Sequence, residues 1–67
     1  MRQRIQDALG RLSRLQRESF VLVHMEGFTV KEAAELLGRA EGTVKSHLHR
    51  ALRRLREELA DLREVEA

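Results

Sequence analysis

Apolar residues recur at helical spacing in four separate stretches of the chain, with polar residues between them. In the third stretch they fall at i, i+3, i+4 and i+7, at Val30, Ala33, Ala34 and Leu37. Thr29 precedes this stretch and Glu32 follows three residues later, which is the capping box that starts a helix. Gly38 can adopt the left-handed conformation in which a helix commonly ends. The four predicted helices cover residues 2–12, 14–25, 30–37 and 41–63.

The second predicted helix, residues 14–25, has its own start and stop signals. Ser13 and Gln16 form a second capping box, and Gly27 ends the helix. Its last part is apolar nearly all round and reads FVLVHM. In a bundle of this size we expect that segment to be buried. We expect Phe28 to fill the junction between the second and third helices.

The last predicted helix carries a leucine seam. Its leucines follow a 4-3-4-3 spacing, at Leu48, Leu52, Leu55, Leu59 and Leu62. This spacing is typical of a helix packed along another helix. A core of three helices covers only the first half of the seam, so the rest packs on residues 2–12, packs on a second chain, or frays. We expect packing on residues 2–12 in a monomer, with a dimer through the seam as the alternative.

The third and fourth helices are joined by a very short turn. Gly38 makes the turn feasible, and the small side chain of Ala34 lets two helices cross closely. This layout is that of a helix-turn-helix whose second helix enters the major groove of DNA. The sequence therefore predicts an all-α, four-helix helix-turn-helix domain over residues 1–67, with a long C-terminal recognition helix.

The composition of the chain excludes several kinds of site and several classes of protein. The chain of 67 residues has no Cys, so disulfides and thiolate metal sites are excluded. No apolar run approaches the roughly 20 residues that span a bilayer, and residues 1–12 are too charged for a signal peptide. We expect a cytoplasmic protein. No nucleophile, base and orienting group stand out together, so we predict no enzyme activity and no cofactor.

Charge is unevenly distributed along the chain, although the net charge is only +2. Residues 41–56 hold five basic residues and one acid, whereas residues 57–67 hold five acids and one Arg. The last helix is thus a basic rod with an acidic end. A basic helix face is the electrostatic footprint of a DNA-binding surface, although such a face is also often only solvated.

The orientation of the last helix selects the candidate contacts. At about 100° per residue, Val44, Leu48 and Leu55 fall on one side, which faces the core. The opposite side and its flanks, together with the start of the third helix, provide the residues expected to contact DNA: Lys31, Gly42, Thr43, Lys45, Ser46, His47, His49, Arg50 and Arg53.

Each of these side chains suits a particular contact. Gly42 lets the helix start approach closely, and the fork of Arg50 matches guanine O6 and N7. Lys45 and Arg53 suit phosphates, which fix register. Lys31 lies at a helix N-terminus, a natural phosphate anchor.

No metal site is predicted from the histidines. His47 and His49 are two positions apart, so they point about 200° from each other on one helix and cannot share an ion. His24 lies on an apolar segment, where a packed histidine is expected.

The combined motifs resemble a known family. The segments LQRESFVL, EGFTVKEAAELLG and EGTVKSHLHRALRRLREEL are similar to region 4 of bacterial sigma factors, especially the extracytoplasmic-function group. The resemblance implies a four-helix domain that binds the −35 promoter element in double-stranded DNA. It also implies docking on the flap of the RNA polymerase β subunit and capture by an anti-sigma factor. By match to the family motif, the DNA-contacting residues are Gly42, Thr43, Lys45, Ser46, His49 and Arg50.

The chain departs from the family pattern at several positions. Ser13 stands where Pro is common, Ser19 where an apolar residue is usual, and Ala40 where a capping residue is usual. Arg39 replaces a packed Ile or Val, and His47 replaces a frequent Arg. Region 2, which binds the −10 element in this family, is not in the sequence. We therefore expect a fragment, or a relative that cannot initiate transcription alone.

Two other interpretations remain open at this point. A LuxR-type response-regulator output domain has a similar four-helix plan and dimerises through its last helix, which the leucine seam allows. A protein-interaction bundle would bind a partner through FVLVHM or the seam and would have little affinity for DNA. The recognised promoter sequence, the inducing signal and the identity of any anti-sigma partner cannot be derived from the residues.

Overall fold

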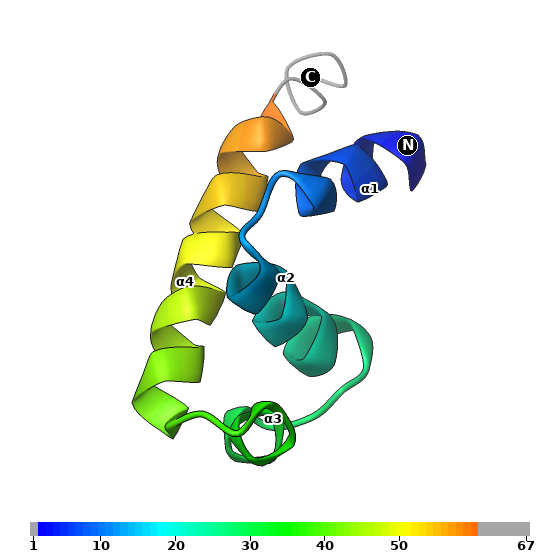
Figure 1. The fold of residues 1–67 in the computed structure, drawn as a ribbon. Helices are drawn as coiled ribbons and strands as arrows, with labels where there is room; N and C mark the ends of the chain where they lie inside the picture. Colours follow the sequence, from blue (N-terminus) through cyan, green and yellow to red (C-terminus); the bar gives the residue numbers. More distant parts are fainter. Residues whose placement is uncertain (1, 61–67) are drawn as a thin grey trace.

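The structure is a computed structural model, and it describes residues 2–60 of the chain. Helices make up most of this part (Figure 1). The elements are α1 (Arg2–Gly10), α2 (Arg14–Phe20), the π-helical turn η1 (Val21–Met25), α3 (Val30–Leu37) and α4 (Glu41–Glu58). Residues 2–60 contain no strand, and the predicted all-α class is confirmed. No helix in this range has the length and apolar character that a membrane crossing requires.

Local side-chain chemistry starts α2 and α3, as predicted. The Ser13 hydroxyl accepts from the Gln16 amide, and the Gln16 side chain accepts from the Ser13 amide, both at 3.3 Å. Thr29 and Glu32 make the same reciprocal pair at 3.1 and 2.9 Å. Each capping box satisfies two backbone N–H groups that have no partner inside the helix.

The turn between α3 and α4 takes three residues. Gly38 lies in the left-handed region, at φ 66° and ψ 36°. Its N–H donates to the Glu35 carbonyl at 3.3 Å, and the Arg39 N–H donates to the Ala34 carbonyl at 3.0 Å, which is a Schellman motif. Ala40 then begins α4 without a side-chain cap. The turn itself is therefore closed by backbone hydrogen bonds, without a side-chain cap at the start of α4.

The expectation that FVLVHM is buried was wrong. The segment leaves the α-helical path after Phe20 and continues as η1, which the Glu26 N–H closes on the Val21 carbonyl at 2.9 Å. No residue of η1 is buried, and Met25 is 60% exposed. The reason is coverage: α3 and α4 lie against only one side of this turn, where Leu22 and Val23 pack.

Phe28 also differs from its predicted role. It is 36% exposed rather than enclosed between the second and third helices. Its backbone N–H, not its ring, makes the junction, because it donates to the Leu22 carbonyl at 2.9 Å. Gly27 supplies the change of direction at φ 83°.

Two buried clusters anchor α4, one near each end. Val44 packs with Ala33 and Ala34 of α3. Further along, Ala51 and Leu55 pack with Ala8 of α1 and with Leu12 in the turn that follows α1. The second cluster confirms that the distal half of α4 packs on the first helix. Figure 1 shows the resulting arrangement, with α3 against the beginning of α4 and α1 beside its far end.

Two helix ends differ from the predicted ones. The first helix stops at Gly10 rather than residue 12, because the Arg11 and Leu12 amides bond three residues back in a tighter turn. The last helix, α4, ends at Glu58, and Leu59 leaves helical geometry at φ −100° and ψ 6°. The predicted end at residue 63 lies outside the described residues. Leu62 lies outside the described residues. Leu48 and Leu55 of the seam are buried within the chain.

Candidate nucleic-acid interface

One side of α4 is buried in the core, and the opposite side is exposed. Val44 and Ala51 are 0% exposed, and Leu48 and Leu55 are nearly so. The residues of α4 on the predicted DNA face that are exposed are Gly42, Lys45, Ser46, His49, Arg50 and Arg53. We call these six residues the outer face of α4. The structure thus brings most of the predicted contacts onto one continuous helix surface.

Thr43 and His47 lie at the edge of this surface. Both are half-buried, because they sit on the flank of α4 between the outer face and the core side. The Nδ1 atom of His47 is buried and has no hydrogen-bond partner in the described residues. Packing rather than hydrogen bonding therefore orients the His47 ring.

Gly42 has no structural reason to be glycine. It lies inside the first turn of α4, and a Cβ built on it would meet no atom within 4 Å. Glycine inside a helix destabilises it by roughly 0.5–1 kcal/mol relative to alanine. The fold has room for a side chain at position 42, and glycine there lowers the stability of the helix. A glycine at such a position suits close approach of an external backbone or base.

The cations of the outer face are not neutralised by any residue that the structure describes. Lys45, Arg50 and Arg53 make no ion pair in the part of the chain that the structure describes. The neighbouring Arg54 differs, because its Nε lies 3.4 Å from the Glu58 carboxylate. The charge of the outer face is therefore available to an outside anion.

Lys31 lies apart from the other predicted contacts, in the first turn of α3, and is exposed. The Glu32 carboxylate already accepts from the Thr29 amide at this helix start. An anion approaching the α3 N-terminus thus meets a carboxylate as well as the helix dipole. Its attraction depends on the Lys31 ammonium more than on the backbone amides.

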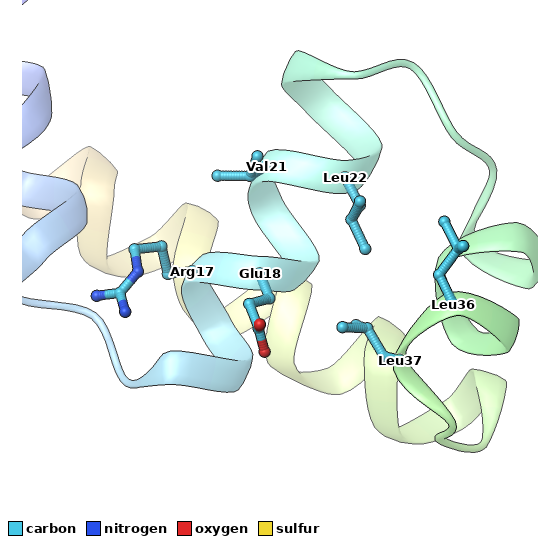
Figure 2. A pocket seen from close by; sticks show the side chains of 6 residues that line it. All are labelled: Arg17, Glu18, Val21, Leu22, Leu36 and Leu37. Carbon is cyan, nitrogen blue, oxygen red and sulfur yellow. The ribbon is translucent and has the colours of Figure 1, made fainter.

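A groove between α2, η1 and α3 was not expected from the sequence. It has a volume of about 400 Å³, and Figure 2 shows the side chains that line it: Arg17, Glu18, Val21, Leu22, Leu36 and Leu37. Leu36 is 61% exposed at its edge. Leu36 adjoins Leu37 outside the i, i+3, i+4, i+7 stripe of α3, and this extra leucine was the available signal. The groove is built from elements other than α4.

Among residues 2–60 there is no group of three or more His, Cys, Asp or Glu side chains that could hold an ion. His24 lies on the η1 turn, where its ring stacks on Phe20 at 5.3 Å between centroids, although the residue is exposed.

Comparison with known proteins agrees with this geometry. The family model for region 4 of sigma-70 matches residues 2–55. The RNA polymerase sigma-E factor of Streptomyces antibioticus is 49% identical over 63 residues, which cover 94% of this chain and 34% of that protein. The ECF RNA polymerase sigma factor SigM of Mycobacterium tuberculosis is 49% identical over 51 residues, covering 76% of this chain and 26% of that protein. The chain thus spans about a third or less of the length of these relatives.

A solved structure gives the same result in three dimensions. The sigma factor RpoE of Bartonella quintana, determined in complex with the anti-sigma factor NepR, superposes with a TM-score of 0.82 and 43% sequence identity. The match covers 84% of this chain and 35% of that one. These similarities favour the sigma-factor interpretation over the response-regulator one. The helix-turn-helix, the basic outer face of α4 and the family match together show that the chain belongs to region 4 of the sigma-70 factors, in the extracytoplasmic-function group.

Proposed function

We propose that this domain binds the −35 promoter element through α4, as the DNA-reading part of a sigma factor that acts with RNA polymerase in the cytoplasm. The observation that carries the proposal is the outer face of α4: it is exposed and cationic, makes no ion pair with another residue among 2–60, and lies opposite the buried side of the helix. A helix held in this way is presented to the major groove without disturbing the core.

The side chains of the outer face divide into two roles. Arg50 is exposed on this face and reads a base, since its planar fork matches guanine O6 and N7. Lys45 and Arg53 hold phosphates, and Lys31 adds a phosphate contact from α3. Ser46, His49, Thr43 and His47 supply shorter polar contacts beside Arg50. Gly42 lets the start of α4 come close to the DNA.

We further propose that RNA polymerase docks in the groove between α2, η1 and α3. The groove has an apolar floor of Val21, Leu22 and Leu37, and the exposed Leu36 extends it. An amphipathic segment of the β-subunit flap would fill it while α4 stays on DNA, because α4 does not line the groove. An anti-sigma factor is the competing class of partner.

The test of the DNA-binding role is a selection of bound sequences with the domain fused to the polymerase flap, because the isolated domain lacks the contacts that polymerase supplies. A −35-like consensus is expected. Arg50→Ala should weaken binding to that consensus by about 1–3 kcal/mol and relax preference at one base position. Lys45→Ala should weaken binding on every sequence and lower the salt slope by about 1.

The results that contradict this role are distinct. Equal losses on all sequences for Arg50→Ala would remove base reading from Arg50. An unchanged salt slope for Lys45→Ala would remove Lys45 from the phosphate contacts. If no consensus emerges from the selection, sequence-specific binding itself is wrong.

The docking role has a separate test in Leu36→Glu. Leu36 is 61% exposed, so the domain should keep its fold. Binding to the isolated flap, measured by calorimetry, should be lost, and binding to consensus DNA should remain. Lys31→Gln, on the same helix but outside the groove, makes the same charge change of −1 and is the control for flap binding. Unchanged flap binding by Leu36→Glu would move the docking site elsewhere.

A further inference from the structure

The last residue of α4, Glu58, joins two guanidinium groups from different parts of the fold. Its Oε2 accepts from Nη1 of Arg11 at 2.7 Å, across 47 positions of sequence. Its Oε1 accepts from Nε of Arg54 at 3.4 Å, one helical turn back. The Glu58 side chain is only 24% exposed, whereas those of Arg11 and Arg54 are 56% and 50% exposed.

The two hydrogen bonds hold the Glu58 carboxylate in one orientation. Each oxygen is committed to a different donor, and Arg11 belongs to the turn after α1, which packs on α4. The carboxylate cannot turn toward solvent without breaking the shorter of its two hydrogen bonds. Arg54 is therefore held toward the C-terminal end of α4, away from Arg50 one turn before it.

We propose that Glu58 is a positioning residue that withholds Arg54 from the DNA backbone. The inference rests on the proposed DNA-binding function and sharpens it. A phosphate that recruits Arg54 must take it from a carboxylate that is three-quarters covered and would lose one of its two donors. Lys45, Arg50 and Arg53 reach phosphate without leaving a partner inside the described chain.

The test is the salt dependence with which the domain, fused to the polymerase flap, binds a fluorescein-labelled duplex carrying a −35-like sequence. Log affinity falls with log salt by about 0.9 for each phosphate contact. Arg54→Gln in the unaltered chain should leave this slope unchanged. Glu58→Gln should steepen it by about 0.9, which is one added contact. Arg54→Gln in the Glu58→Gln background should remove that increase.

Two control variants separate this role from simpler ones. Glu57→Gln makes the same charge change at the adjacent exposed residue and should leave the slope unchanged. Arg11→Gln cuts the hydrogen bond to α1 but leaves Arg54 on Glu58, and it should also leave the slope unchanged. Thermal melts of every variant check that the fold is retained.

Several results would overturn the inference while the DNA-binding function stands. An equal loss of slope for Arg54→Gln in both backgrounds would mean that Arg54 already contacts phosphate. A steeper slope for Glu57→Gln would indicate a general charge effect, and a steeper slope for Arg11→Gln would indicate loosening of α1. If the flap-fused domain without substitutions shows no salt-dependent binding, the proposed function fails first, and the inference fails with it.

Discussion

Removing the buried hydroxyl of Ser19 should stabilise the domain. Ser19 lies on α2, is 0% exposed, and is one of the two largest fully buried side chains together with Val44. Its Oγ has no hydrogen-bond partner in the described part of the chain. The position is usually apolar in the family that the sequence resembles. Ser19→Ala removes the unpaired polar group and keeps the rest of the contact.

The expected increase in the free energy of unfolding combines two stabilising contributions and one destabilising contribution. Burying a hydroxyl without a partner costs about 1–3 kcal/mol in proteins. Alanine also has a higher helix propensity than serine, by up to about 0.5 kcal/mol. The oxygen-sized void left behind takes back part of this gain, because core cavities destabilise. We expect a net increase of about 1–2 kcal/mol in the free energy of unfolding.

Urea unfolding followed by circular dichroism measures this change. A gain of 1 kcal/mol corresponds to a rise of roughly 4–8 °C in the melting temperature of a domain of this size. Ser46→Ala is the matched control, since Ser46 lies inside α4 and is exposed. Ser46→Ala gains the same helix propensity as Ser19→Ala, but it does not remove a buried hydroxyl. If Ser19→Ala is no more stabilising than Ser46→Ala, the hydroxyl is bonded in the core and the reasoning is refuted.

Three further substitutions test the helix-turn-helix by thermal melts. Ala40→Ser supplies the side-chain cap that α4 lacks and should add about 1 kcal/mol of stability, whereas an unchanged melt would show that the α4 start needs no cap. Gly38→Ala places a Cβ in the left-handed region and should cost roughly 1–2 kcal/mol; no loss would mean that the turn adapts. Gly42→Ala should add about 0.5–1 kcal/mol of stability and weaken binding to the −35 duplex, and unchanged binding would remove Gly42 from the interface.

The helix starts and the turn could be predicted because they depend on short-range chemistry. The capping boxes at Ser13 and Thr29 and the left-handed Gly38 involve residues no more than a few positions apart. Burial along α4 was also predictable from its period, since Val44 and Leu55 fall on one side of a helix whose other side is polar. The exposure of Ser46, His49 and Arg50 follows from the same period.

Features that depend on tertiary coverage could not be predicted. The exposure of Met25 and Phe28 reflects how little of the η1 side is covered by an eight-residue α3, and composition does not reveal this. The end of α4 at Glu58 and its ion pair with Arg11 join residues 47 positions apart. The docking groove likewise requires α2 and α3 to meet at a particular angle. The DNA contacts themselves stay a prediction.

The outer face of α4 has a consequence for how such domains diverge. Its exposed positions contribute nothing to either buried cluster, so exchanging them leaves the scaffold intact. On the proposed function, a lineage can therefore acquire a new promoter preference by a few substitutions, without any compensating change in the interior. Duplicated copies of one stable frame can come to govern separate sets of genes in this way.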